Sequence, residues 1–148
     1  MKKNICNSLI AIFFALLISG CSASSISSMF WSDEDKAFLA HLDSVDTKFF
    51  IPNSDSKNAW DRAQIWLSKY SVDNKIKTVT DVVIQTEQRS GFNYSVTRTS
   101  IGDKIQIEVE CASDNFLLKA DCTQRAKMLS YYIKDGVNPP NDYILGKH

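Results

Sequence analysis

The chain has 148 residues and carries 17 basic and 17 acidic side chains, so its formal net charge is zero when histidine is neutral. This length provides for one compact domain with short extensions rather than for two domains. No stripe of lysine and arginine marks a surface that could neutralise phosphates, so the composition argues against a nucleic-acid partner.

Residues 1–20 predict a secretory signal peptide. Lys2 and Lys3 supply a positive start, Leu9–Ile18 is an uninterrupted apolar stretch, and small residues follow at Ser19-Gly20. The alternative is a transmembrane helix. At about 1.5 Å per residue, however, the apolar stretch covers only about half of a bilayer core of about 30 Å. We therefore expect this segment to be cleaved rather than to span a membrane.

The four residues Ile18-Ser19-Gly20-Cys21 resemble the lipobox of bacterial lipoproteins. This resemblance implies that the Cys21 thiol receives a diacylglycerol group, that the chain is cut before it, and that the freed amine is acylated. Two or three acyl chains together give stable anchoring, whereas one gives only reversible binding. Ser22 in place of an aspartate implies an outer-membrane protein that faces the periplasm, with the inner membrane or the cell surface less favoured.

Residues 21–31 comprise the lipidated cysteine and a flexible tether, since the stretch up to Ser28 is rich in serine and has no charge. A single α+β domain is expected over residues 32–136. Its first element is a short helix over 33–42, with Ser32 as cap and acidic residues in the first turn. The residues 29–31 before it are expected to pack on this helix, and contact with the membrane interface is the alternative.

The clearest helix in the sequence is predicted over 56–70. A brief extended piece, 49–52, precedes it and is limited by Pro52. The apolar side chains of the helix fall on one face, with the charged ones elsewhere, which is the pattern of an amphipathic helix. The predicted buried face consists of Ala59, Trp60, Ala63, Trp66, Leu67 and Tyr70.

The middle of the chain changes to a period of two, which predicts antiparallel strands with one buried and one solvated face. In 75–85 the alternation slips near Thr80, so we expect a bulge or two short strands. Further strands are predicted at 92–97 and 105–111.

A second main helix follows and ends at Asp135-Gly136, with a glycine stop and two prolines beyond it. Residues 137–148 are expected to form an irregular tail. The predicted fold is therefore α+β, with an antiparallel sheet of three to four strands and two main helices packed on one face. The predicted buried face of the second helix consists of Cys122, Ala126, Leu129, Tyr132 and Ile133.

The four cysteines have different expected fates. Cys6 leaves with the signal peptide and Cys21 is acylated, so Cys111 and Cys122 remain. An even pair in an oxidising compartment predicts a disulfide that joins the last strand to the last helix. Two buried free thiols or a zinc pair are the alternatives, and the zinc pair is disfavoured because His41 and His148 lie at no ligand spacing.

Residue types that could support catalysis are few. His41 is expected to be an ordinary surface residue, and His148 has no neighbours to orient it. Glu108 and Glu110 share one strand face, where solubility explains them better than acid–base chemistry. Core packing explains Trp60 and Trp66. Five threonines are interpreted as ordinary strand residues with exposed hydroxyls, namely Thr78, Thr80, Thr86, Thr97 and Thr99. We expect no enzymatic activity, metal or cofactor.

The order of helix, antiparallel strands and helix, with Ala59-Trp60-Asp61-Arg62-Ala63 opening the first main helix, resembles small TBP-like and helix-grip domains of bacterial lipoproteins. Such domains bind or scaffold. We therefore expect a binding or scaffold module of the cell envelope, with an envelope protein as partner at the open sheet face or at an edge. Binding of a small lipid or peptide is the alternative, and a hydrolase with an unrecognised site is a distant third.

Overall fold

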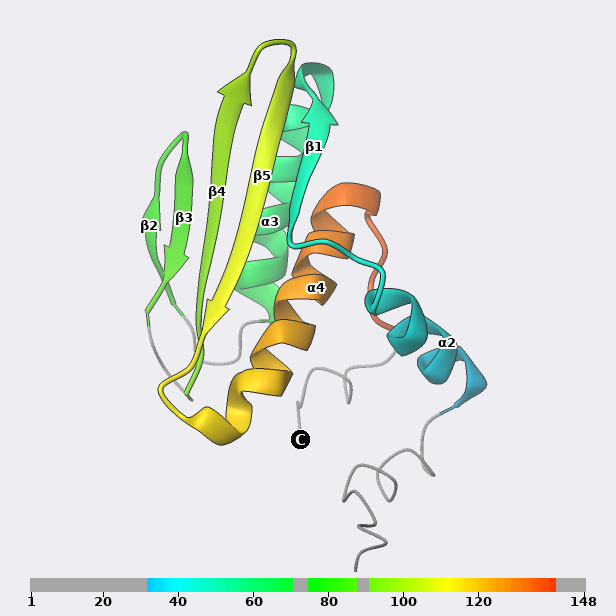
Figure 1. Cartoon of the computed structure of the whole chain (residues 1–148). Coiled ribbons are helices and arrows are strands. Elements are labelled where there is room, and N and C mark those ends of the chain that lie inside the picture. Colours follow the sequence, from blue (N-terminus) through cyan, green and yellow to red (C-terminus); the bar gives the residue numbers. More distant parts are fainter. Residues whose placement is uncertain (1–31, 71–74, 88–90, 141–148) are drawn as a thin grey trace, which may run out of the picture. The chain divides into compact units, whose positions relative to one another are not determined.

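The computed structural model describes residues 32–70, 75–87 and 91–140 (Figure 1). The fold below is that of the unit Asp33–His148. The predicted signal peptide, Cys21, the tether and His148 all lie outside the described residues. The signal peptide, the lipid anchor and the tether therefore stay predictions.

The described residues of the domain form three α-helices and five strands, and two short 3-10 turns precede α3 and α4 (Figure 1). The predicted helices at 33–42 and 56–70 are confirmed with these same bounds, and the second main helix ends at Asp135 as expected. In chain order the elements are α2 (Asp33–Leu42), β1 (Lys48–Pro52), η3 (Asn53–Asp55), α3 (Ser56–Tyr70), β2 (Ile76–Val79), β3 (Val83–Thr86), β4 (Asn93–Ile101), β5 (Lys104–Ala112), η4 (Phe116–Leu118) and α4 (Lys119–Asp135).

The sheet is antiparallel throughout, in the order β1-β5-β4-β3-β2, and has one strand more than the predicted maximum. The short piece 49–52 is a paired strand: β1 aligns with β5 from the Lys48–Glu108 pair to the Pro52–Lys104 pair. The 75–85 segment forms two strands, β2 and β3, and also contains a register shift between Ile76 and Thr78. The expectation of two short strands is therefore confirmed, whereas the register shift lies closer to the start of β2 than the slip expected near Thr80.

The Thr80 side chain helps to hold the turn between β2 and β3. The Thr80 hydroxyl accepts the backbone N–H groups of Val82 (3.2 Å) and Val83 (3.0 Å). The two backbone N–H groups therefore have a hydrogen-bond acceptor at the point where the strand pairing is interrupted. The turn also explains the slip in the alternating pattern at Thr80.

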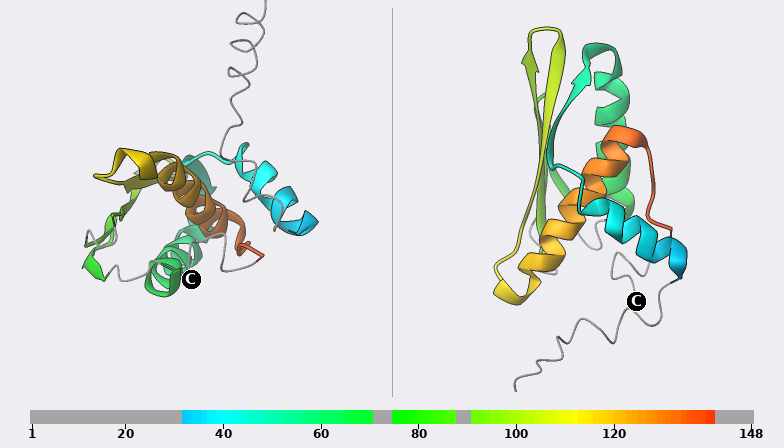
Figure 2. Two further views of the ribbon diagram at one scale, coloured as in Figure 1. Left: turned by 90° about the horizontal axis from the view of Figure 1, so that it is seen from below. Right: turned by 45° about the vertical axis from the view of Figure 1, so that its right-hand side comes forward.

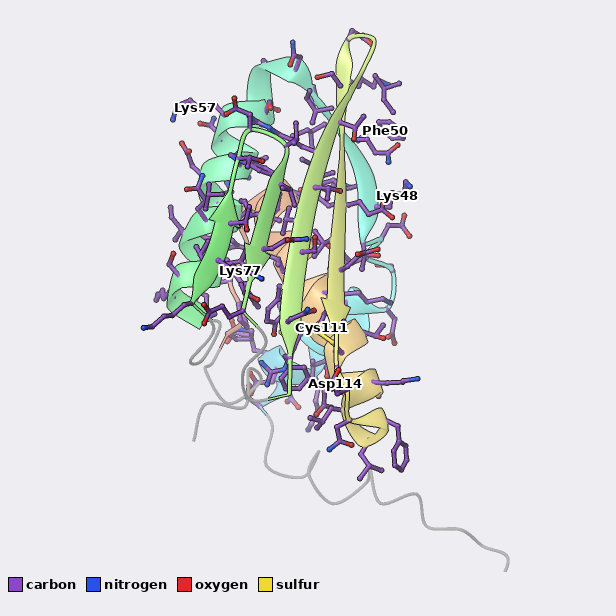
Figure 3. The ribbon with its side chains drawn as sticks, turned by 90° about the vertical axis from the view of Figure 1, so that its left-hand side faces the viewer. Lys48, Phe50, Lys57, Lys77, Cys111 and Asp114 are labelled. Carbon is purple, nitrogen blue, oxygen red and sulfur yellow. A yellow bond between two sulfur atoms is a disulfide. The ribbon has the colours of Figure 1, made fainter. Side chains whose placement is uncertain are left out.

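Helices α3 and α4 cover one face of the sheet and leave the other free of helices (Figures 2 and 3). All six residues of the predicted face of α3 are buried. Helix α2 packs on α4, where the His41 and Tyr131 rings lie 4.8 Å apart and Lys127 Nζ donates to the Asp43 carbonyl oxygen at 2.9 Å. Helix α4 also buries Met128 and Ser130, which its predicted face does not include, whereas Tyr132 of that face is only half-buried.

The core between sheet and helices is filled by large side chains. Trp66 is completely buried, meets Tyr94 of β4 edge to face at a centroid distance of 5.6 Å, and lies 5.8 Å from the Tyr70 ring. Aromatic pairs in these arrangements are favourable beyond the area that they bury. Core packing is therefore the role of Trp66, whose indole N–H has no hydrogen-bond partner in the described part of the chain.

Candidate functional site

The two remaining cysteines meet where the sheet joins the last helix. Cys111 is near the end of β5 and Cys122 is in the first turns of α4; their Cα atoms are 5.4 Å apart and their sulfurs are at disulfide-bonding distance (Figure 3). Cys111 lies on the same side of β5 as the buried Val109, which is the phase that the alternating pattern predicts. The pair encloses the short connection from β5 to α4.

That connection is an ordered turn that presents two apolar side chains. The N–H of Leu117 donates to Asn115 Oδ1 (3.0 Å), and the N–H of Asn115 donates to Ser113 Oγ (3.2 Å). Leu118 is partly buried and packs toward Gly91, whereas Phe116 and Leu117 are 74% and 70% exposed. They are the most exposed large apolar residues of the described domain.

Arg125 of α4 contacts two aromatic residues at the start of β4, close to the cysteine pair. The Arg125 guanidinium of α4 lies 4.7 Å from the centre of the Phe92 ring and hydrogen-bonds the Tyr94 side chain. Burial raises the pKa of Tyr94 above its ordinary value of 10.0, while the positive charge and the hydrogen bond of Arg125 act in the opposite direction. The start of β4 is thereby tied to α4 beside the cysteine pair.

The helix-free sheet face carries mixed polar side chains and a few apolar ones. Glu108 accepts a hydrogen bond from Lys48 Nζ at 3.1 Å, across the β1–β5 pair, and Glu110 is exposed. Phe50 is 52% exposed, and Ile101 near the β4–β5 turn is 49% exposed. By the alternation of the strands, both lie on this face. It is a solvated surface with Phe50 near its upper end (Figure 3) and Ile101 at the end of β4 that leads into the β4–β5 turn.

A depression of about 510 Å³ lies between the start of α3 and the sheet, and Arg98 of β4 is one of the residues that line it. The Arg98 guanidinium is 4.6 Å from the centre of the Trp60 ring, donates to Ser56 Oγ at 3.2 Å, and also donates to the Asp81 carbonyl oxygen. Trp60 therefore supports a cation as well as the core. Sequence reasoning missed this role, because the spacing of Trp60 and Arg98 along the chain carries no signal for the contact.

A second depression, of about 460 Å³, borders the lower part of β5. The Val109 N–H donates to the Thr47 carbonyl oxygen at 2.8 Å, and beyond this point the chain before β1 turns away into α2. The last residues of β5 therefore extend beyond Lys48, the first residue of β1, and have no partner in that strand. The lining residues are Thr47, Val109, Glu110, Cys111, Ala112, Thr123 and Ala126.

The interpretation of the threonines is wrong at two positions. Thr80 lies in the turn between β2 and β3 and not in a strand. Thr86 is buried, and its hydroxyl accepts the backbone N–H of Tyr94 at 2.9 Å rather than facing water. The hydroxyl is covered because Thr86 lies on the helix side of β3, two residues after the buried Ile84. The position of Thr86 in the sheet, and not its residue type, therefore determines that its hydroxyl is a buried hydrogen-bond acceptor.

The described ranges contain no group of three or more His, Cys, Asp or Glu residues that could hold a metal ion. Within the same ranges, no helix has the length and apolar character needed to cross a bilayer. Comparison with protein-family models, with curated proteins and with solved structures finds no significant match to this chain.

Proposed function

We propose that this protein is a lipid-anchored binding module of the bacterial cell envelope. The anchor is Cys21, for which the lipobox resemblance is the support. The domain binds an envelope protein through the helix-free face of its sheet and carries out no catalysis. Its site is the outer membrane, on the periplasmic side.

The helix-free sheet face is the observation that carries this proposal. The opposite face is covered by α3 and α4 except at the two depressions described above, and it packs against the largest side chains of the core. On the free face, Phe50 and Ile101 stand out of a polar surface, and apolar anchors within a polar rim are typical of protein interfaces. We therefore place the partner over the upper part of this face.

The anchor is tested by metabolic labelling with a radioactive or clickable fatty acid. Cys21→Ala abolishes incorporation, because the acylated thiol is removed. Cys6→Ala is the matched control and leaves incorporation unchanged, since Cys6 is discarded with the signal peptide. Label that survives in Cys21→Ala would show that the anchor is wrongly assigned.

The contact face is tested by photo-crosslinking in intact envelopes. A benzophenone amino acid replaces Phe50 in one variant and Ile65 of α3 in the other, and both positions are 52% exposed. We expect a discrete adduct with an envelope protein from position 50 and none from position 65. Adducts from position 65 alone would place the partner on the helices instead.

A small-ligand binder is the second candidate, and the depression at Arg98 is the observation that favours it. Its volume suits a small lipid headgroup or a short peptide, and Val82 and Ile105 add apolar lining beside the guanidinium. Native mass spectrometry of the protein purified from its own envelope tests this. A bound small molecule of constant mass supports a ligand binder, and bare protein argues against it.

A further inference from the structure

We propose that Phe116 and Leu117 of η4 insert into the lipid surface beside the anchor and hold the domain in one orientation on the membrane. This inference rests on the proposed function, because it requires lipids at Cys21. It adds a second membrane contact, formed by the folded domain itself.

The first support is the exposure of an apolar pair on an ordered turn. Phe116 and Leu117 are adjacent and 74% and 70% exposed, while Leu118 turns inward. The hydrogen bonds of Asn115 to Leu117 and Ser113 fix the turn, and the cysteine pair closes it. Because the turn is already ordered, inserting these side chains loses little additional conformational freedom.

The second support is the position of the turn. The start of α2 and η4 both lie in the lower half of the domain in Figure 1, away from the β4–β5 turn at its upper end, and the view from below in Figure 2 shows them on opposite sides of the domain. Cys21 precedes Asp33 by twelve residues. At about 3.3–3.6 Å per residue, this segment reaches no further than roughly 40 Å. The anchor therefore limits how far the start of α2, and with it this half of the domain, can lie from the bilayer.

The third support distinguishes a lipid surface from a protein partner. A stable protein interface needs about 800 Å² from each partner, which two side chains on a narrow turn do not supply. Insertion into an interface needs no such area when the anchor already holds the turn at a high local concentration of lipid. A weak contact is then occupied for much of the time.

The test uses the full lipidated chain in vesicles of phosphatidylethanolamine and phosphatidylglycerol. A benzophenone amino acid replaces Phe116, and the matched control carries it at Phe50, which Figure 3 shows at the other end of the sheet from Asp114. We expect lipid adducts at position 116 in roughly tenfold excess over position 50, because one side chain lies in the bilayer interface and the other in water. Leu117 serves as a second labelled position.

The outcomes separate this inference from the proposed function. Fatty acid at Cys21 is measured in the same sample. If Cys21 is acylated and positions 116 and 117 give no excess of lipid adducts over position 50, the insertion is refuted and the anchor stands. If Cys21 carries no fatty acid, the proposed function itself fails. Adducts to a protein in place of lipid, in intact envelopes, would refute insertion in favour of a protein contact.

Discussion

Arg62 of α3 donates hydrogen bonds from Nη1 to the carbonyl oxygen of Ile133 at 3.1 Å, and also to that of Lys134 at 3.0 Å. These oxygens belong to the last turn of α4, where the helix has no backbone donors of its own to offer. A cation at this end also opposes the negative end of the helix dipole. One side chain thus joins the two helices that cover the sheet.

Arg62→Ala is expected to lower the free energy of unfolding by about 1–3 kcal/mol, since it removes hydrogen bonds from a charged donor. Arg62→Lys should recover part of this loss, because it keeps the charge but lacks the planar guanidinium. Urea unfolding followed by circular dichroism measures both. Equal stabilities for Arg62→Ala and the unchanged protein would show that the helix end is satisfied without Arg62.

The cysteine pair should stabilise the domain measurably. Replacing both Cys111 and Cys122 with alanine is expected to lower the free energy of unfolding by about 3 kcal/mol, on the chain-entropy account of a short closed loop. Reduction of the unchanged protein should give a similar loss. Two thiols that alkylate readily in the untreated protein would contradict a disulfide in the cell.

Tyr94 should make stability depend on alkaline pH. Because its pKa is raised in the folded protein, Tyr94 holds its proton more tightly there than in the unfolded chain. Its contribution is fully present below about pH 10 and is lost as the pH rises through the raised pKa. Stability measured from pH 8 upward should therefore fall less steeply above about pH 10 in Tyr94→Phe.

Tyr131→Phe is the control for this experiment, because it removes a tyrosine hydroxyl from the contact between α2 and α4 instead of from beside Arg125. An identical alkaline slope in Tyr94→Phe and the unchanged protein would show that burial of Tyr94 does not set the dependence on pH.

Substitutions at two glycines should distinguish the cost of backbone strain from the cost of side-chain crowding. Gly91 and Gly102 have φ angles of +79° and +62°, so alanine at either position is expected to cost about 1–2 kcal/mol. A β-carbon at Gly91 would also lie 3.0 Å from Leu118 Cδ1, whereas nothing lies within 4 Å at Gly102. Gly91→Ala should therefore destabilise the domain more than Gly102→Ala in thermal unfolding. The opposite order would mean that Leu118 moves aside freely.

The sequence predicts the features that depend on near neighbours. The buried face of α3 repeats at helical spacing, so Trp66 and Leu67 could be assigned to the core in advance. The β1 strand could not be recognised as part of the sheet, because Lys48 and its partner Glu108 are 60 residues apart. The buried hydroxyl of Thr86 likewise depends on Tyr94 in the adjacent strand.

The exposed pair in η4 was missed for a related reason. Phe116 and Leu117 stand just before a helix, where apolar residues commonly belong to its buried face. Only the folded domain shows that Leu118 is partly buried beside Gly91 while the two residues before it are exposed. The residue types alone do not reveal that choice.

On the export route proposed above, the pairing of β1 with β5 also constrains the order in which the domain folds. An exported chain emerges with its amino terminus first, so β1 appears while β5 is still to come. The hairpins β2–β3 and β4–β5 can form from local contacts, but β1 must stay unpaired until Glu108 has followed it. An extended strand without a partner is prone to wrong pairing. We therefore expect the nascent protein to depend on a periplasmic chaperone until β5 has been delivered.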